Sequence, residues 1–223
     1  MNPSIAVKIF EAGRNAGADF VEIFEEETRS SVLGIKDRHI ETATAGTEYG
    51  IGIRLLYGTE VLYGFTSDDS EEALVKLVQT LAFGRIAKAG ASSVPFELRL
   101  EKRVSDFNMA AFKDPRLLGQ AVKQDFLFRA DKAARSVSDK VAQVGSTVTD
   151  VCSSITIMDS EGLNLVLNRS RVRVNVTVTA SDGSERLTTH EAPGALGGYE
   201  LLENYSPEKI ATECAERVVR MLD

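Results

Sequence analysis

The residues with the clearest chemical potential form the string Thr189-His190-Glu191-Ala192-Pro193-Gly194-Ala195. A helix that presents two imidazoles and a glutamate to one zinc ion is a common hydrolytic centre. Here the positions four and five residues after His190 are Gly194 and Ala195, and Pro193 would break a helix in its interior. One imidazole and one carboxylate leave a zinc site short of ligands. The string therefore predicts a surface or groove loop.

A glycine-rich stretch continues from this string, Gly194-Ala195-Leu196-Gly197-Gly198-Tyr199. It lacks the lysine of a phosphate-binding loop, and it does not lead from a strand into the helix of a β-α-β unit. Glycine at this density favours close approach of the backbone, either to another domain or to an extended peptide. The alternative is a plain loop.

Three arginines, Arg169, Arg171 and Arg173, recur at every second position and so share one face of a predicted strand. Such a row suits a carboxylate or an acidic partner, with a solvated face as the alternative. The sheet edge at Arg171–Ala180 is expected to pair with an extended peptide. The candidate residues for contact with a peptide or another domain are Arg171, Arg173, His190, Glu191, Gly197, Gly198 and Tyr199.

The sequence offers little else for catalysis, so no catalytic or metal-binding residue is predicted. It has two histidines, His39 and His190, no tryptophan, and no arrangement of Ser/His/Asp or Cys/His type. Its two cysteines, Cys152 and Cys214, are too few for a disulfide framework. Both lie in patterned segments, which favours buried free thiols in a reducing cytoplasm.

Charge and hydropathy exclude further classes of protein. Lysine and arginine number 26 against 33 aspartate and glutamate, a net charge of −7, which argues against nucleic-acid binding. No apolar run approaches the roughly 20 residues that span a bilayer, and no secretory leader is recognisable at the N-terminus. The expectation is a cytoplasmic protein that binds neither nucleic acid nor membrane.

Four helices are needed to position these residues. Asn2-Pro3 and Ser206-Pro207 each combine a cap with a proline at the first helical position, and Asp114-Pro115 repeats the pattern. A fourth start lies at Ser67-Asp68-Asp69-Ser70, followed by two glutamates that suit a helix N-terminus. The predicted helices run from Pro3 to about Asn15, from residue 67 to 82, from 114 to about 137, and from 206 to 221. Cys214 falls on the apolar face of the last helix.

Between the helices the hydrophobic period changes to two, which predicts short antiparallel strands. Five are predicted in the first half: Phe20–Glu27, Ser30–Lys36, His39–Ala45, Gly50–Tyr57 and Glu60–Thr66. Five are predicted in the second half: Gln143–Asp150, Cys152–Asp159, Asn164–Asn168, Arg171–Ala180 and Arg186–His190. Tyr57-Gly58 and Asp182-Gly183 are predicted hairpin turns.

The two halves follow the same plan, helix, meander and helix. The predicted fold class is α+β, with a duplicated helix–antiparallel meander–helix unit whose two similar halves pack together. The predicted division is a first repeat over residues 1–90, a connector over 91–113, and a second repeat over 114–223. Together they are expected to form one N-terminal domain.

Several strings in series resemble one family, the TldD/PmbA (TldE) metallopeptidases. The strings are Gly17-Ala18-Asp19-Phe20-Val21-Glu22-Ile23, Gly50-Ile51-Gly52-Ile53-Arg54, Gly64-Phe65-Thr66-Ser67-Asp68-Asp69, Asp159-Ser160-Glu161-Gly162 and Gly197-Gly198-Tyr199-Glu200. They resemble the N-terminal domain of that family over nearly the whole chain. The last string leans toward the TldD branch.

The resemblance implies a function that composition does not show. TldD and TldE form a heterodimer that cleaves unfolded peptides in the cytoplasm, and the N-terminal domain encloses the path to the metal. The zinc motif, His-Glu-x-x-x-His with a distant cysteine, belongs to the C-terminal domain of the TldD partner. An older description links PmbA to modulation of DNA gyrase.

The sequence departs from the family because it contains no His-Glu-x-x-x-His motif, so no catalytic residue is carried over. We expect an N-terminal substrate-access and subunit-contact domain that is inactive alone, with zinc bound in a C-terminal domain absent from this chain. Expected partners are a TldE/PmbA-like subunit or a second copy, and an unfolded peptide. The alternative is a stand-alone binding or regulatory protein acting on gyrase or on a toxin–antitoxin pair.

Overall fold

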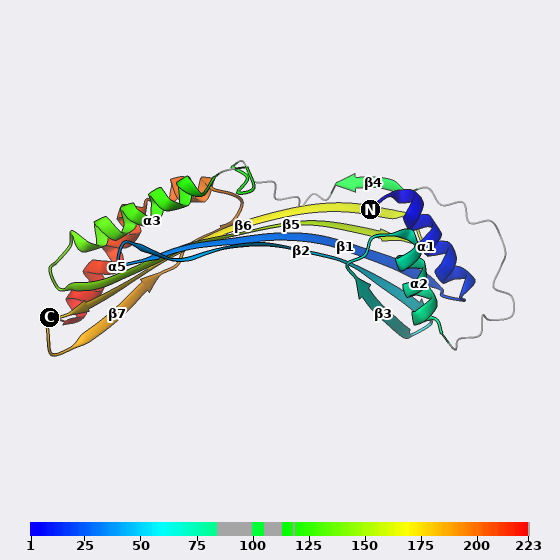
Figure 1. Cartoon of the computed structure of the whole chain (residues 1–223), viewed down its shortest axis with the longest axis horizontal. Helices are drawn as coiled ribbons and strands as arrows, with labels where there is room; N and C mark the ends of the chain where they lie inside the picture. Colours follow the sequence, from blue (N-terminus) through cyan, green and yellow to red (C-terminus); the bar gives the residue numbers. More distant parts are fainter. Residues whose placement is uncertain (84–99, 105–112, 118, 223) are drawn as a thin grey trace. The chain divides into compact units, whose positions relative to one another are not determined.

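The computed structural model describes residues 1–83, 100–104, 113–117 and 119–222. In these residues the chain combines helices with a β-sheet (Figure 1). The helices are α1 (Pro3–Asn15), α2 (Glu71–Leu81), α3 (Gln120–Arg135), α4 (Glu200–Asn204) and α5 (Pro207–Leu222). The strands are β1 (Phe20–Lys36), β2 (His39–Tyr57), β3 (Glu60–Thr66), β4 (Glu101–Val104), β5 (Val141–Asp159), β6 (Leu163–Ser181), β7 (Arg186–Glu191) and β8 (Gly194–Leu196). This mixed architecture confirms the α+β class.

The described strands form one sheet in the order β3-β2-β1-β5-β6-β4. β7 and β8 pair with β6 as well, both antiparallel. β4 pairs with β6 in parallel, over Leu163–Val166, so the expectation of purely antiparallel pairing is wrong at this strand. The predicted connector over 91–113 lies mostly outside the described residues, and β4 falls within it.

Four strands are much longer than predicted. Eight of the predicted short strands merge in pairs into β1, β2, β5 and β6, which have 17, 19, 19 and 19 residues. The predicted breaks fall where the alternation of apolar side chains fades, as at Ala45–Tyr49 and Arg169–Ser170. The strand continues there because backbone pairing with a neighbouring strand does not require an apolar side chain.

Helix boundaries follow the predicted caps, with one exception. The side chain of Asn2 accepts a hydrogen bond from the N–H of Ser4, and Ser70 caps α2 through the N–H of Ala73. α3 starts at Gln120 instead of Asp114. The Asp114 carboxylate accepts a bond from the N–H of Arg116 at 2.9 Å, which closes a local turn before the helix.

The chain folds into two compact units, each assembled from separated segments. Unit 1 comprises Met1–Thr28, Glu48–Asn108 and Ser153–Asn168. Unit 2 comprises Arg29–Thr47, Met109–Cys152 and Arg169–Asp223. The duplication and the division at residues 91–113 remain predictions.

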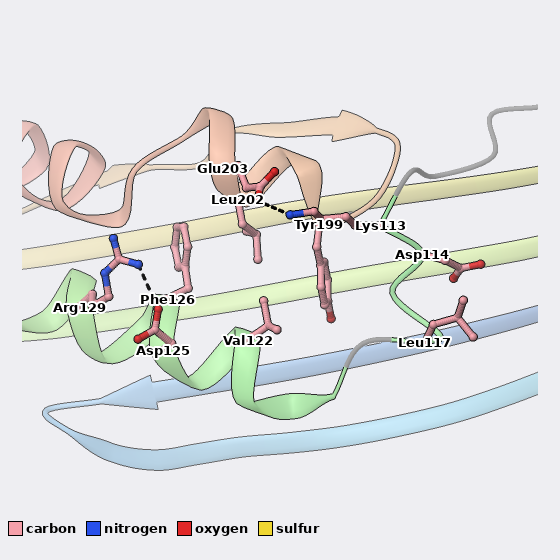
Figure 2. A pocket seen from close by; sticks show the side chains of 10 residues that line it. All are labelled: Lys113, Asp114, Leu117, Val122, Asp125, Phe126, Arg129, Tyr199, Leu202 and Glu203. Carbon is pink, nitrogen blue, oxygen red and sulfur yellow. Dashed lines mark hydrogen bonds and ion pairs between the residues drawn. The ribbon is translucent and has the colours of Figure 1, made fainter.

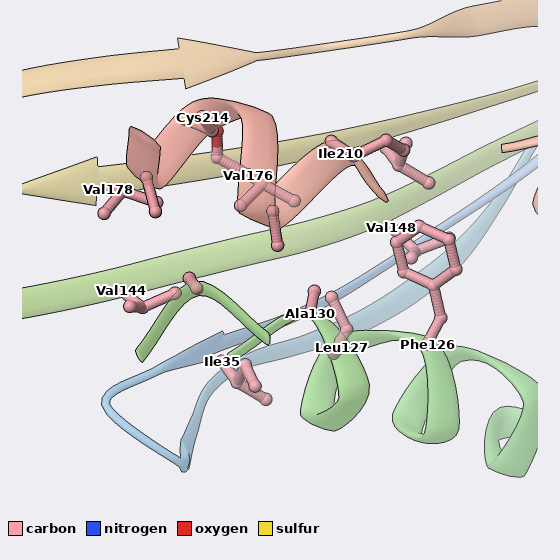
Figure 3. Close-up of a cluster of buried hydrophobic side chains, with 14 of the residues drawn as sticks. Ile35, Phe126, Leu127, Ala130, Val144, Val148, Val176, Val178, Ile210 and Cys214 are labelled. Carbon is pink, nitrogen blue, oxygen red and sulfur yellow. The ribbon is translucent and has the colours of Figure 1, made fainter. Parts of the chain in front are cut away.

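Each unit has a hydrophobic core of its own. In unit 1, Ile9 and Phe10 of α1 and Leu74 of α2 are buried with Val21 and Ile53 of the sheet. In unit 2, α3 and α5 cover the sheet, and Figure 3 shows Phe126, Leu127, Val176 and Cys214 converging there. The predicted core position of Cys214 is thereby confirmed.

Among the helices of the described residues, none combines the length and the apolar character of a membrane span.

Candidate functional site

A charged side chain lies on the core face of α3. Lys123 is 2% exposed and precedes Phe126, Leu127 and Ala130 by three, four and seven residues, so all four lie on one side of the helix. Ala121 and Val122, the two residues before Lys123, are exposed.

Three side chains surround the Lys123 ammonium group. It forms an ion pair with Asp150 of β5 and a hydrogen bond with Ser31 of β1. It also lies 6.0 Å from the ring centroid of Tyr199, within reach of a cation–π attraction. We call Ser31, Lys123, Asp150 and Tyr199 the Lys123 cluster.

Asp150 is the common acceptor of this cluster. It is 6% exposed and lies on the buried face of β5 with Val144, Val148 and Cys152, at even positions of the strand. Its Oδ2 accepts hydrogen bonds from the Tyr199 hydroxyl at 2.9 Å and from the Ser31 hydroxyl at 3.2 Å. Such a dense set of donors is what a buried carboxylate requires.

Tyr199 acts as a donor in this arrangement. Burial, and then the negative charge and hydrogen bond of Asp150, raise the pKa of Tyr199 well above its ordinary value. The phenol is therefore protonated throughout the physiological range. Gly197, with φ of +132°, and the N–H of Gly198, which donates to Glu200 at 2.7 Å, shape the turn that leads into Tyr199.

Two hollows flank the cluster within unit 2. The first, which we call the Tyr199 hollow, has a volume of about 400 Å³. Figure 2 shows Phe126 and Val122 of α3 and Leu202 of α4 around it, with Tyr199 beside them. Ion pairs border it, between Lys113 and Glu203 and between Arg129 and Asp125.

The second, which we call the Asp150 hollow, has a volume of about 380 Å³ and a more polar lining. It lies against Ser31 and Asp150 of the cluster, and against Ala45, Gly46 and Thr47 of β2. Gln120, the first residue of α3, and its N-cap Gly119 also border it, together with Arg29 and Cys152. Asp150 and Ser31 thus connect a buried ion pair to a solvent-accessible cavity.

Cys152 does not supply a nucleophile to this hollow. The thiol is 4% exposed, and burial raises its pKa above the ordinary value. The Ser170 hydroxyl lies 3.4 Å from its sulfur as a donor. A thiol in this state is neutral at physiological pH and unreactive. The arrangement offers fixed charges and hydrogen-bonding groups, which bind and orient polar atoms.

The predicted contact residues are not brought together in one site. Arg171 and Arg173 are exposed on β6, where they pair with Leu196 and Gly194 of β8. His190 is exposed on β7. Glu191 forms an ion pair with Arg217 of α5. Tyr199 is 2% exposed and lines the Tyr199 hollow, so its contact with a peptide or another domain stays a prediction.

The predicted peptide-binding edge at Arg171–Ala180 is also wrong. β7 pairs with Val176–Ser181, and β8 pairs with Arg171–Arg173. β5 lies on the other side of β6, so this stretch has strand partners on both sides. The glycine-rich string supplies β8, so part of its backbone pairs with β6 of the same chain.

The described residues do not fit a zinc ion. Across residues 1–83, 100–104, 113–117 and 119–222, no three His, Cys, Asp or Glu side chains are grouped to share a metal. His39 instead uses Nδ1 in a 2.8 Å hydrogen bond with the carbonyl oxygen of Asp37. Glu191, as described above, is engaged with Arg217.

Sequence reasoning missed Lys123 and Asp150, although a signal was present. A lysine three and four residues before Phe126 and Leu127, and an aspartate in phase with Val144 and Val148, are polar residues at core positions. Their partners could not be read from the sequence, because Ser31 and Tyr199 are 92 and 49 residues away from Lys123 and Asp150.

Two family models match the chain. The "PmbA/TldA metallopeptidase domain 1" matches residues 21–88, and the "PmbA/TldA metallopeptidase central domain" matches residues 113–222. A metalloprotease from Methanothermobacter thermautotrophicus is 28% identical over 209 residues, 92% of this chain and 43% of the relative. A metalloprotease from Synechocystis is 24% identical, with coverages of 92% and 43%.

Solved structures share the fold at lower identity. A candidate modulator of a DNA gyrase from Thermotoga maritima has a TM-score of 0.76 and 16% identity, over 97% of this chain and 47% of that one. TldE from Thermococcus kodakarensis has a TM-score of 0.69 and 14% identity, over 96% and 47%. The chain spans less than half the length of each of these proteins. On the two family models, the chain belongs to the PmbA/TldD metallopeptidase family.

Proposed function

We propose that this chain is the substrate-access and subunit-contact part of a TldD-like zinc metallopeptidase that acts on unfolded peptides in the cytoplasm. The observation that carries the proposal is the pair of family matches, to domain 1 and to the central domain, over residues 21–88 and 113–222. The leaning toward the TldD branch stays a prediction.

The chemistry of unit 2 supports a binding role. The Lys123 cluster holds charge in a fixed place, and its carboxylate is already engaged by the Lys123 ammonium group and by the hydroxyls of Ser31 and Tyr199. The two hollows beside it offer about 400 and 380 Å³ of accessible space next to hydrogen-bonding groups. Such hollows receive side chains of a bound polypeptide.

We place the zinc ion of the proposed enzyme outside residues 1–223. The described residues bring no three ligands together, and a catalytic zinc site needs three protein ligands and an open position. This part of the proposal assigns peptide contact to this chain and hydrolysis to a metal-bearing domain.

The test is to measure binding, hydrolysis and metal content on one preparation. The probe is fluorescein-labelled, reduced and carboxymethylated α-lactalbumin, a permanently unfolded polypeptide. We expect a saturable rise in fluorescence polarisation, intact probe on a gel, and less than 0.1 zinc per chain after dialysis, roughly the background level for a chain with no ligand set. Stoichiometric zinc with cleavage of the probe would contradict the proposal, as would absence of binding.

Subunit contact is tested by size-exclusion chromatography with light scattering. The expected partner is a TldE/PmbA-like subunit or a second copy of the chain. A complex of defined stoichiometry on mixing with such a subunit, or a homodimer alone, is the expected result. A chain that stays monomeric in both cases would contradict this part.

The alternative is a regulatory protein without peptidase function, acting on gyrase or on a toxin–antitoxin pair. Similar solved structures include proteins described as candidate modulators of DNA gyrase. Inhibition or stimulation of gyrase supercoiling by the purified chain, without binding of unfolded polypeptide, would favour this alternative.

A further inference from the structure

One strand edge in unit 2 lacks a neighbour. β3 pairs with β2 only over Ile51–Tyr57, and β1 lies on the other side of β2. Residues 39–50 of β2 therefore have no second strand partner among the described strands. Within unit 2 this leaves His39–Thr47, which we call the β2 edge. All its residues except Thr42 are exposed.

The composition of the β2 edge is unusual for an edge that only faces water. Natural sheets protect such edges with lysine, proline, bulges or short strands, because an unpaired row of N–H and C=O groups invites another strand. The stretch Thr42–Thr47 has the sequence Thr-Ala-Thr-Ala-Gly-Thr, without charge and without proline. Its small side chains leave the backbone accessible.

A cavity adjoins this edge. Ala45, Gly46 and Thr47 line the Asp150 hollow, together with Ser31 and Asp150 of the Lys123 cluster. A strand added to a sheet gains affinity from main-chain hydrogen bonds, and pockets for alternate side chains add selectivity. The β2 edge and the Asp150 hollow provide both components within one unit.

We propose that the β2 edge binds an extended segment of unfolded polypeptide as an additional strand, with one polar side chain of that segment entering the Asp150 hollow. This inference rests on the proposed function and names the site through which it is exerted. Ser31, Asp150 and Arg29 offer hydroxyl, carboxylate and guanidinium groups to such a side chain.

A second copy of the chain fits the edge less well. A two-fold antiparallel pairing of the β2 edge, His39–Thr47, places Glu41 of each copy opposite Ala45 of the other, beside the hollow that Asp150 lines. This pairing brings a second carboxylate toward Asp150, and like charges repel. An unfolded polypeptide has no fixed register and avoids these contacts.

Proline substitutions at two successive positions test the proposal. Successive N–H groups of a strand point to opposite sides, so one of Thr44→Pro and Ala45→Pro removes a donor that faces outward, and the other removes a bond to β1. The variant whose melting temperature stays closer to that of the wild type is the outward one. Glu72→Pro is the control, because it places a proline at an exposed position in the first turn of α2, outside the β2 edge and the Asp150 hollow.

Binding of the labelled, reduced and carboxymethylated α-lactalbumin to the whole chain is the readout. We expect the outward proline variant to bind at least tenfold more weakly, and Glu72→Pro to bind within twofold of the wild type. Equal binding by the wild type and the outward proline variant would show that the polypeptide does not bind at the β2 edge. The proposed function would remain in place. No binding by the wild type would overturn both.

Light scattering on the same samples tests whether a second copy of the chain, instead of an unfolded polypeptide, occupies the β2 edge. A wild-type dimer that becomes monomeric in the outward proline variant would assign the edge to a second copy and overturn the proposal. The same oligomeric state in both, together with lost polypeptide binding, supports it.

Discussion

Lys123 carries a positive charge into the core of unit 2, where it needs partners. Its ammonium group is almost fully buried and is held by Asp150, Ser31 and the ring of Tyr199. A buried ion pair contributes little net stability compared with apolar residues of the same shape. Removing one partner, however, leaves an uncompensated charge in the core.

Lys123→Met is therefore expected to lower the free energy of unfolding by about 3–5 kcal/mol, since Asp150 keeps its charge and loses its cation. The triple variant Lys123→Met, Asp150→Leu, Tyr199→Phe removes both charges and the phenol hydroxyl that donates to Asp150, and we expect it to recover most of that loss. Urea unfolding followed by circular dichroism measures both.

The control for this series is Lys8→Met. Lys8 pairs with Glu71 at 2.7 Å, but both side chains are about half exposed, so about 0–1 kcal/mol is expected. Equal losses for Lys8→Met and Lys123→Met would show that burial of the pair has no energetic weight.

Asp37 anchors the turn between β1 and β2. Asp37 and Arg38 have φ of 48° and 68°, a conformation that two non-glycine residues adopt at some cost. The Asp37 carboxylate accepts bonds from the N–H of Val144 at 3.0 Å, from Gln143 at 3.2 Å and from Arg135 at 2.5 Å. Burial raises the pKa of Asp37, but these bonds outweigh burial and lower it overall.

Asp37→Ala is expected to lower stability by about 1–3 kcal/mol, because the N–H of Val144 loses its carboxylate acceptor and the left-handed backbone loses its anchor. Asp37→Asn keeps an acceptor and tolerates the left-handed region, so a smaller loss is expected. Thermal unfolding of the two variants measures both losses of stability. A larger loss for Asp37→Asn than for Asp37→Ala would refute this account.

At the scale of elements, α3 and α5 are joined by a two-pronged ion pair. Arg129 of α3 donates to Glu208 of α5 at 2.6 and 2.9 Å. The hydrogen bonds from Arg129 lower the pKa of Glu208 to about 2 from an ordinary value of 4.5. The unfolded state therefore binds the proton more tightly, and the contribution of this pair is present above pH 4.5 and lost as pH falls toward 2.

Glu208→Gln is expected to flatten the fall in stability between pH 5 and pH 2, by only a small amount because the pair is half exposed. Glu216→Gln is the control, since that carboxylate lies on the same helix and its 3.9 Å pair with Arg220 joins no second element. Parallel pH profiles for Glu208→Gln and the wild type would contradict the expected linkage.

Local chemistry made the helix ends and two turns predictable. Asn2-Pro3 and Ser206-Pro207 mark the starts of α1 and α5, and Gly58 and Gly183 occupy the expected turns with φ of +62° and +97°. The length of the strands was not predictable in this way. Alternation fades at Ala45–Tyr49, yet extended backbone continues because a neighbouring strand satisfies it.

The site was predictable only in part. Lys123 and Asp150 fall in phase with buried residues of their elements, which is a local signal. The closure of the β6 edge by β8, however, and the meeting of Ser31 with Lys123 depend on pairings between distant segments. Periodicity alone carries no information on such pairings.

At the scale of the whole molecule, the interleaving of the units determines how the chain can be divided. The core of unit 1 includes Met158, and the N–H of Val21 donates to Ser160 at 3.0 Å. The core of unit 2 includes Leu33 and Ile35. Each unit therefore takes essential residues from both ends of the sequence.

Fragments 1–90 and 114–223 are accordingly expected to remain unfolded when expressed separately and to regain native circular dichroism when co-expressed. Heteronuclear NMR spectra of each fragment provide the measurement. A well-dispersed spectrum from either fragment alone would support independent repeats and contradict the interleaved assembly.

The hydrogen bond from Tyr199 to Asp150 also gives the protein an intrinsic optical reporter. The chain has no tryptophan, and its five tyrosines supply the absorbance that appears when a phenol ionises to phenolate. Burial and a neighbouring carboxylate raise the pKa of Tyr199, and likewise that of Tyr49 beside Glu25. Part of the phenolate absorbance at alkaline pH should therefore appear slowly, at the rate of unfolding, so that a stopped-flow pH jump reads the opening of both cores without any label.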